Sequence, residues 1–260
     1  MPTRSVPLPA DDPTLANASL DDLALRWKDV AARAAISAET MTGLDRNAQG
    51  LGITGETLME HAGTAVAAAA RALLEHNGRM DRPVLILAGP GNNGGDGFVA
   101  ARRLAEWGVP AIAVLVAAEE KPRPADAARN WKRLDGLEHV TKIHAAVARD
   151  VAILGHGIDK AGIVVDALLG TGVRGQLREP IREAVHVIRR AREAGVPVLA
   201  VDTPTALDLT SGDPSDPVVR ADLTITFHRP KTGLQARIGK ALAGRILVAP
   251  IGIPAEVDRA

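Results

Sequence analysis

The sequence contains no cysteine and no tyrosine, and aromatic residues make up only 2% of its 260 residues. The absence of cysteine excludes disulfides, thiolate metal sites and a thiol nucleophile, and it leaves the cellular compartment undetermined. Because 46% of the residues are nonetheless hydrophobic, alanine, valine, leucine and isoleucine must form the core. Such a core is typical of helices packed on buried strands.

The sequence also lacks net charge, since 31 lysines and arginines balance 31 aspartates and glutamates. It has no basic run of the kind that neutralises a phosphate backbone, so nucleic acid is a poor candidate partner. No stretch approaches the roughly 18 consecutive apolar residues of a membrane span, and residues 1–12 lack the apolar segment of a signal peptide. We therefore expect a soluble, cytoplasmic protein with no membrane or nucleic-acid partner.

By composition, the chain divides into a short tail and one domain. Residues 1–18 are rich in proline, aspartate and alanine, which is typical of a flexible N-terminal tail. Residues 19–260 show no internal repeat and no linker, so we expect them to form a single domain. Capping signals and apolar spacing predict helices near residues 20–34, from Ser37 to near Gly50 or Gly52, and from Thr54 onward in an alanine-rich stretch.

Beyond residue 83, short apolar runs alternate with helical stretches. Continuous hydrophobicity within each run indicates strands that are buried on both faces. Strands and helices in alternation predict right-handed crossovers and a doubly wound, mostly parallel sheet of the α/β class. The runs are residues 84–88, 111–116, 163–165, 196–201, 223–227 and 246–249, with a weaker one at 139–143, and the intervening helices are predicted at 97–107, 124–134, 145–154 and 178–193.

The turn after the first apolar run is rich in glycine. It reads Gly-Pro-Gly-Asn-Asn-Gly-Gly-Asp-Gly at residues 89–97. Glycines let the backbone approach a ligand closely, and the free N–H groups at a helix start favour an anion such as phosphate. The stretch satisfies G-x-G-x-x-G, but no acidic residue follows at the position that the dinucleotide fingerprint requires. A purely structural turn rarely holds so many glycines, so we expect a binding loop.

Two further turns begin with an acidic residue. Asp166 opens a glycine-rich loop at residues 166–175, and Asp202 directly follows the next apolar run along the chain. A carboxylate at the carboxyl end of a buried strand is costly to desolvate, which makes Asp202 a candidate acid/base or cation ligand. Each acid has the alternative role of capping its own loop. Arg174 either steadies a phosphate or is solvated.

The remaining polar candidates carry weaker signals. Lys231 follows the next-to-last predicted strand, so it either faces the same crevice or is exposed. His61, His156 and His228 show no metal-ligand spacing, which favours hydrogen-bonded structural roles. The sequence has no G-x-S-x-G elbow and no lysine-bearing P-loop, which argues against a serine hydrolase or a P-loop kinase.

Several segments occur in the order seen in the NAD(P)H-hydrate epimerases, the YjeF N-terminal domain family, which this sequence therefore resembles. Asn-Asn-Gly-Gly-Asp within its glycine frame is a specific motif, and the resemblance extends over roughly residues 37–254. The matching segments are residues 58–63 (Leu-Met-Glu-His-Ala-Gly), 89–97, 166–175, 202–208, 221–233 and 251–254.

This resemblance implies a Rossmann-like three-layer α/β/α sandwich over residues 19–260 and a homodimer. It also implies an isomerase that interconverts the R and S hydrates of NADH and NADPH and binds potassium (K+). The potassium ligands that the resemblance implies are Asn93, Asp166 and Thr205, and hard oxygen ligands of this kind suit such a cation. The residues implied to contact the hydrated nucleotide are Asn92, Asn93, Gly94, Gly95, Asp96, Gly170, Thr171, Gly172, Val173, Arg174, Gly175, Gln176 and Asp202.

The expected chemistry takes place at C6 of the hydrated nicotinamide ring. The ring nitrogen can push out the hydroxyl to give an iminium-like species, which water re-enters from the opposite face. Asp202 is the expected catalytic residue, which protonates the departing hydroxyl and deprotonates the returning water. Two alternatives stay open: a non-catalytic nucleotide-binding or scaffold module on the same fold, and an isomerase or hydrolyase of another nucleotide or sugar phosphate.

The sequence departs from the family pattern at two positions. Ala206 stands where the family usually has glycine, a residue suited to unusual φ or close ligand approach. His61 stands where the family commonly has asparagine, whereas Thr205 keeps the hydroxyl of the usual serine. The fused dehydratase domain of many bacterial relatives is not part of this sequence, so we expect a separate dehydratase protein in the same pathway.

Overall fold

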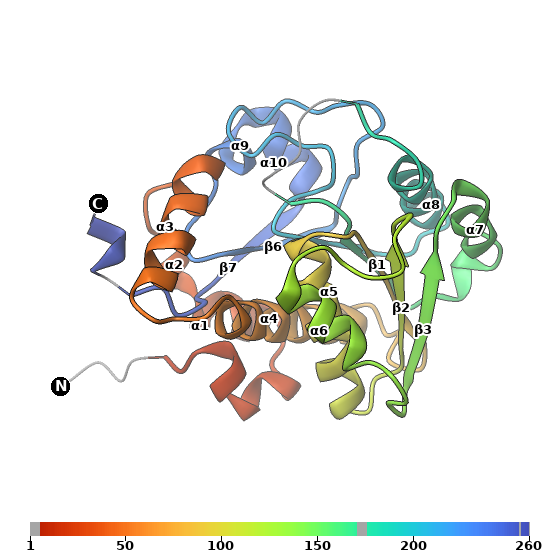
Figure 1. The fold of residues 1–260 in the computed structure, drawn as a ribbon, viewed down its shortest axis with the longest axis horizontal. Coiled ribbons are helices and arrows are strands. Elements are labelled where there is room, and N and C mark those ends of the chain that lie inside the picture. The colour runs from red at the N-terminus through yellow and green to blue at the C-terminus, as the bar shows by residue number, and fades with distance from the viewer. Residues whose placement is uncertain (1–5, 171–175, 255, 260) are drawn as a thin grey trace.

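The apolar runs of the sequence form one parallel sheet (Figure 1). The computed structural model describes residues 6–170, 176–254 and 256–259, and within them seven strands pair in parallel in the order β3-β2-β1-β4-β5-β6-β7. The predicted α/β class and the mostly parallel sheet are confirmed. The strands are β1 (Val84–Ala88), β2 (Ala111–Val116), β3 (Val140–Ala145), β4 (Ile163–Ala167), β5 (Val198–Val201), β6 (Leu223–Phe227) and β7 (Arg245–Ala249).

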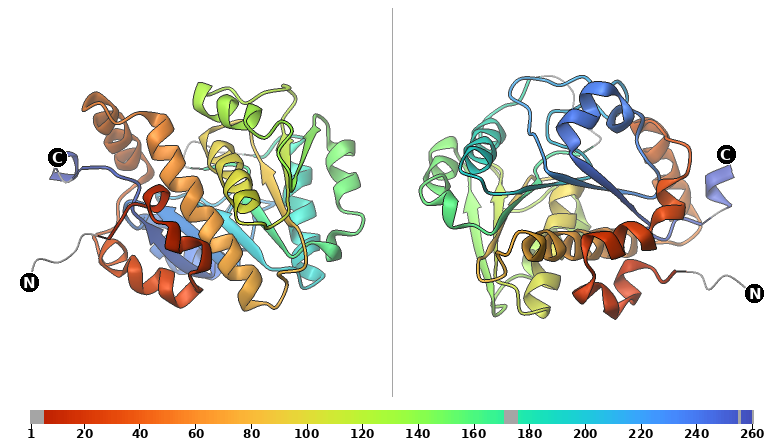
Figure 2. Two further views of the ribbon diagram at one scale, coloured as in Figure 1. Left: turned by 90° about the horizontal axis from the view of Figure 1, so that it is seen from below. Right: turned by 180° about the vertical axis from the view of Figure 1, so that it is seen from behind.

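Helices cover both faces of this sheet (Figure 2). In β1, Ile86 packs in the cluster that contains α4, whereas Leu85 and Leu87 pack in the cluster that contains α8. This alternation explains why both faces of the strand are apolar. No helix in the described ranges is long and apolar enough to cross a bilayer. The helices are α1 (Leu20–Arg26), α2 (Lys28–Ala31), α3 (Ala38–Gly50), α4 (Gly55–His76), α5 (Asn92–Glu106), α6 (Ala125–Lys132), α7 (Ala148–Leu154), α8 (Ile181–Glu193), α9 (Thr232–Gln235) and α10 (Arg237–Ala243).

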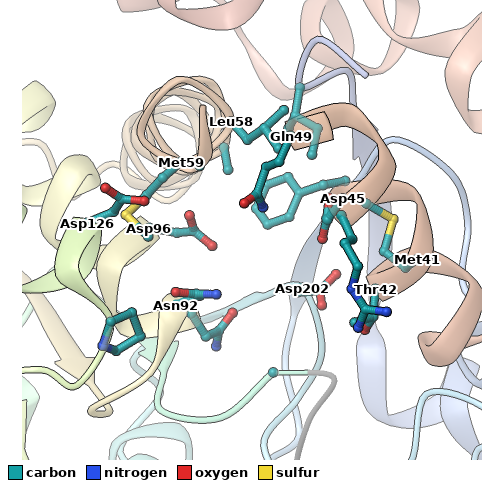
Figure 3. A pocket seen from close by; sticks show the side chains of 18 of the residues that line it. Met41, Thr42, Asp45, Gln49, Leu58, Met59, Asn92, Asp96, Asp126 and Asp202 are labelled. Atoms are coloured by element: carbon teal, nitrogen blue, oxygen red, sulfur yellow. The ribbon is translucent and has the colours of Figure 1, made fainter. Parts of the chain in front are cut away.

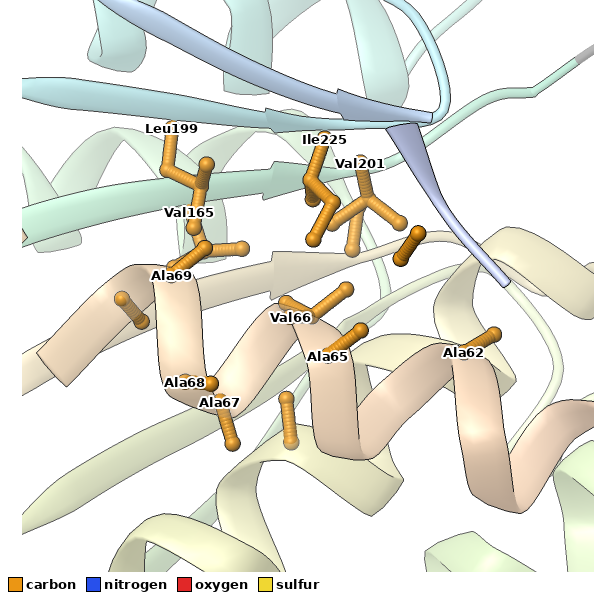
Figure 4. Close-up of a cluster of buried hydrophobic side chains, with 14 of the residues drawn as sticks. Ala62, Ala65, Val66, Ala67, Ala68, Ala69, Val165, Leu199, Val201 and Ile225 are labelled. Carbon is orange, nitrogen blue, oxygen red and sulfur yellow. The ribbon is translucent and has the colours of Figure 1, made fainter. Parts of the chain in front are cut away.

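The alanine-rich helix α4 packs directly on the middle of the sheet. Its residues 65–70 are fully buried, and its small side chains lie against Val165, Leu199 and Ile225 (Figure 4). A side chain at Gly63 would overlap Val99 of α5, so α4 and α5 also approach each other closely. The alanine stripe is therefore a packing surface that brings a helix close to both a sheet and a second helix.

The prediction of a flexible tail over residues 1–18 is wrong for the described part of that segment. Residues 9–17 form two short 3-10 helices, η1 (Pro9–Asp11) and η2 (Pro13–Asn17), which pack against α4. Each begins with a proline, whose fixed φ suits a helix start. The Asp12 side chain accepts a hydrogen bond from the Thr14 N–H at 3.0 Å and pairs with Arg26. Proline and aspartate here stabilise local structure rather than prevent it.

Burial of Leu15 provides a test of this packing, because its side chain is only 1% exposed. We expect Leu15→Ala to lower the free energy of unfolding by about 2–4 kcal/mol through lost burial and a residual cavity. Leu25→Ala is the matched control, since Leu25 is 66% exposed and its truncation should change stability by less than about 0.5 kcal/mol. Denaturant unfolding measures both. Equal stability of the Leu15→Ala variant and the wild type would mean that the segment is not docked in solution.

Candidate active site

A cavity of about 530 Å³ opens at the carboxyl edge of the sheet (Figure 3). The strand order explains its position, because the chain leaves β1 toward β2 but leaves β4 toward β5. Loops that diverge in this way leave a crevice above the neighbouring strand ends. The walls come from α3, α4 and α5 and from the segments that follow β5 and β6.

One wall of the cavity is the start of α5, which begins at Asn92 rather than at the predicted residue 97. Gly91, the residue before the helix, provides no side-chain cap, so backbone N–H groups of the first turn stay available to an anion. Asn92, Asn93 and Asp96, three of the implied substrate contacts, line the cavity. Gly94 does not line the cavity. It is buried, and a side chain at this position would overlap the Gly89 carbonyl.

The second glycine-rich loop is described only at its two ends. Gly170 lines the cavity, and a Cβ built on it would lie 3.4 Å from the Asn93 side chain. Gln176 is exposed and is not among the residues that line the cavity. The implied substrate contacts Thr171, Gly172, Val173, Arg174 and Gly175 lie outside the described residues.

Two of the three implied potassium ligands, Asp166 and Thr205, lie where β4 and β5 end, and the third, Asn93, lies in the first turn of α5. Asp166 is fully buried, and it accepts hydrogen bonds of 2.7 Å from both the N–H and the hydroxyl of Thr205. Burial raises the pKa of Asp166 to about 6, although these hydrogen bonds favour its charged form. No described lysine or arginine forms an ion pair with it. Asn93 is 8% exposed and its buried Nδ2 atom has no hydrogen-bond partner among the described residues.

Asp202 follows β5 and has a left-handed φ of 61°, a conformation that aspartate tolerates better than most residues. Its Oδ1 atom accepts a 2.8 Å hydrogen bond from the Thr226 hydroxyl and lies 3.3 Å from the Lys231 Nζ atom. Lys231 is fully buried and also donates to Thr226 Oγ1 and the Phe227 carbonyl at 2.9 Å. Of the two roles open to Lys231, the structure therefore selects the one inside the crevice.

The sequence motifs did not identify Asp45, which reaches the cavity from α3 (Figure 3). Burial and the nearby Asp202 charge raise its pKa to about 6, although Lys231 opposes this rise. Burial and the charges of Asp202 and Asp45 also raise the pKa of Asp96 well above its usual range. Asp45 borders the apolar stripe of α3, which contains Met41, Leu44 and Ala48. That neighbourhood is the only sequence signal of its partial burial.

Residues 55–233 match the sequence family that is described as "YjeF-related protein N-terminus". The chain belongs to this family. A relative from Cenarchaeum symbiosum, named NAD(P)H-hydrate epimerase, is 36% identical over 86% of the chain and 98% of its own length. A relative from Hyperthermus butylicus, named bifunctional NAD(P)H-hydrate repair enzyme Nnr, is 37% identical. The chain spans about two fifths of that protein, since the match covers 39% of it.

A solved structure supports the YjeF-type fold independently. The crystal structure of yeast YNL200c superposes with a TM-score of 0.75 over 87% of the chain and 93% of the yeast chain. Sequence identity is 24%, so this likeness concerns the fold alone.

Neither departure from the YjeF pattern touches the cavity. His61 is buried on α4, where its Nδ1 atom accepts a 3.1 Å hydrogen bond from the Ala10 N–H of the N-terminal segment. Ala206 does not line the cavity, but its φ of 74° is a left-handed conformation. A glycine adopts this conformation without strain, whereas an alanine does so at a cost of about 1–2 kcal/mol.

We therefore expect Ala206→Gly to stabilise the protein by about 1 kcal/mol, because relief of the strain exceeds the entropy that glycine adds to the unfolded chain. Ala161→Gly is the matched control, since Ala161 has an ordinary φ of −65° and should lose about 0.5–1 kcal/mol. Denaturant midpoints of the two variants should move in opposite directions. A loss of stability in both variants would contradict the strain at residue 206.

Proposed function

We propose that this chain is an NAD(P)H-hydrate epimerase, which interconverts the R and S hydrates of NADH and NADPH. The observation that carries the proposal is the buried Asp202 carboxylate, held by Thr226 and Lys231 on one side of a cavity whose other side is the start of α5. The names of relatives that match the chain over most of its length support the same activity. A scaffold module would not need a buried carboxylate and ammonium facing an open cavity.

In the proposed reaction, Asp202 provides acid/base catalysis at C6 of the hydrated ring. The C6–O bond breaks as the ring nitrogen forms a C=N bond, and water then adds to the opposite face. Such proton transfer contributes about 10² to 10⁴ in rate. The free N–H groups at the start of α5 are suited to the phosphates, and holding the phosphates there would keep the ring beside Asp202.

Potassium is proposed as the resident cation, with Asn93, Asp166 and Thr205 as its ligands. Asp166 is fully buried and has no ion-pair partner among the described residues, and a buried carboxylate of this kind favours a bound cation. The side-chain oxygens of Asp166, Thr205 and Asn93 are hard ligands that suit potassium. A bound cation would supply positive charge beneath the phosphate end of the cavity.

Three further expectations belong to the proposal. We infer a homodimer from the family resemblance, and we propose that the protein is cytoplasmic. We also infer a separate dehydratase protein. Relatives of similar length carry the epimerase name alone, whereas the much longer ones are named bifunctional.

The variant Asp202→Asn tests the activity, because asparagine keeps the shape of the side chain but cannot accept a proton. Interconversion of the two NADH hydrates, followed by NMR or chromatography, should fall at least about 10²-fold. Affinity for the dinucleotide should change far less, since the proposed phosphate contacts lie in α5. An equally active variant would reduce Asp202 to a structural cap, and an inactive wild type at saturating potassium would contradict the epimerase proposal.

Thermal unfolding in potassium chloride and in tetramethylammonium chloride at matched ionic strength tests the cation. Binding to the folded state alone should raise the melting temperature in potassium. Thr205→Val removes the hydroxyl ligand, so its melting temperature should be the same in both salts. A potassium-dependent rise of equal size in this variant would argue against the assigned ligands.

A further inference from the structure

The carboxyl groups that face the cavity outnumber the cations beside them. Among the described residues, Asp45, Asp96 and Asp202 line its inner walls, and Lys231 is the buried cation beside Asp202. In Figure 3, Asp96 comes from the α5 side, and Asp45 and Asp202 lie on the opposite side, so the space between them is bordered by acid groups on both sides. Arg46, which is exposed, also lines the cavity, so the five groups together carry one negative charge in excess when all are ionised.

The protein itself does not neutralise this excess. No described residue donates a hydrogen bond to the carboxyl group of Asp45 or Asp96, and both groups are half-buried. Desolvated carboxylates without partners are costly, and both pKa values are accordingly raised. In the same cavity, Asn93 is more than nine-tenths buried and has an amide nitrogen without a partner. Together, these groups indicate that a ligand, rather than the fold, completes the site.

The proposed reaction supplies a positively charged ligand group. Loss of hydroxide from C6 leaves the positive charge on the ring as an iminium, whereas both hydrates have a neutral ring. Oxidised NAD+ and NADP+ are stable dinucleotides with a cationic ring of nearly the same shape. A carboxylate about 4 Å from such a charge contributes about 1 kcal/mol at the dielectric constant of water and more at a partly buried site.

We propose that Asp45 is a specificity-determining residue that completes an anionic cradle for a cationic nicotinamide ring, so that NAD(P)+ occupies this cavity in preference to dinucleotides with a neutral ring. The inference rests on the proposed function for the identity of the ligand. If the cradle has this role, the oxidised dinucleotide is an analogue of the charged intermediate, and it should be a competitive inhibitor of hydrate conversion.

The preference should depend on pH. The pKa of Asp45 is raised to about 6. Its negative charge therefore contributes to the preference for a cationic ring above that pH, and the contribution is lost as the pH falls through that value. Binding of a cationic ring would lower this raised pKa of Asp45 and release a proton where the free protein holds one. Other charged groups surround Asp45. Those that line the same cavity are Asp202 after β5, Lys231 after β6, Asp96 on α5 and Arg46 on α3. Helix α3 also packs against η4 (Val257–Arg259), whose Asp258 contacts His228 and Arg229.

Calorimetric titration of the full chain with NAD+ and with 1,4,5,6-tetrahydro-NAD, a stable analogue with a neutral ring, tests the cradle without any turnover. The wild type should bind NAD+ about tenfold more tightly at pH 8, and the ratio should shrink toward pH 5. In Asp45→Asn, the ratio should fall severalfold at pH 8 and lose most of its pH dependence. Any remaining dependence belongs to Asp96.

Asp126→Asn is the matched control. Asp126 lines the same cavity, but it pairs with Arg129 at 3.0 Å, so its removal should leave the preference for NAD+ and its pH dependence unchanged. Melting temperatures of both variants check the fold. Asp45 accepts no hydrogen bond from the described residues, so the isosteric change should cost little stability.

The possible outcomes separate this inference from the proposed function. Hydrate conversion together with equal affinity for the two dinucleotides would overturn the cradle alone, as would an unchanged preference in Asp45→Asn. A clear preference for the cationic ring without hydrate conversion would support the cradle and contradict the epimerase proposal. Failure of the wild type to bind either dinucleotide would contradict both.

Discussion

The buried carboxylate of Asp166 joins the ends of two neighbouring strands, and the geometry of the cavity depends on this connection. Both donors of Thr205 bond to it, and the Leu169 N–H donates to the Thr205 hydroxyl at 3.2 Å. Hydrogen bonds to a charged group contribute about 1.5–3 kcal/mol each, enough for the set to offset a desolvation cost of several kcal/mol. Asp202 lies three residues before Thr205 on the same short segment, so its position is fixed from both ends.

A second connection fixes the wall that carries Asp45. The Ile36 N–H donates to the Pro230 carbonyl at 2.9 Å, and the Thr232 N–H donates to the Ile36 carbonyl at 3.0 Å. These bonds flank Lys231, which in turn contacts Asp202. Helix α3 begins two residues after Ile36, so α3, Lys231 and Asp202 form one connected unit. The position of α3 relative to Asp202 is therefore set by backbone hydrogen bonds together with the buried Lys231 side chain.

The sheet could be predicted from the sequence because buried parallel strands leave a direct signal in continuous apolar runs. Residues 84–88, 111–116 and 223–227 match β1, β2 and β6 at both ends. The start of α5 could not be predicted, because Asn92 to Gly95 have low helix propensity. Close packing explains the glycines instead, since a side chain at Gly94 would overlap the Gly89 carbonyl. The docked N-terminal segment was missed for a related reason, since composition does not reveal that Leu15 finds a buried position against the rest of the fold.

Site residues on strand ends were easier to predict than those on helices. Asp166 and Asp202 follow apolar runs, and topology alone brings such positions to one edge of the sheet. Asp45 reaches the same edge only through the packing of α3, and Lys231 only through the turn that buries it. Neither arrangement has a local sequence signature, because each depends on contacts between segments far apart in the chain.

The cavity has an electrical polarity that the overall composition conceals. The chain has no formal net charge, yet the start of α5 presents the positive end of a helix dipole, while the inner walls hold more carboxyl groups than cations. The charges of a dinucleotide are complementary to those of the cavity, because its phosphates are negative and its nicotinamide ring becomes positive during the proposed reaction. Local fields of this kind orient a ligand without attracting unrelated polyanions, because their effect is confined to distances of about one Debye length. A neutral protein can therefore bind a charged nucleotide in a single orientation.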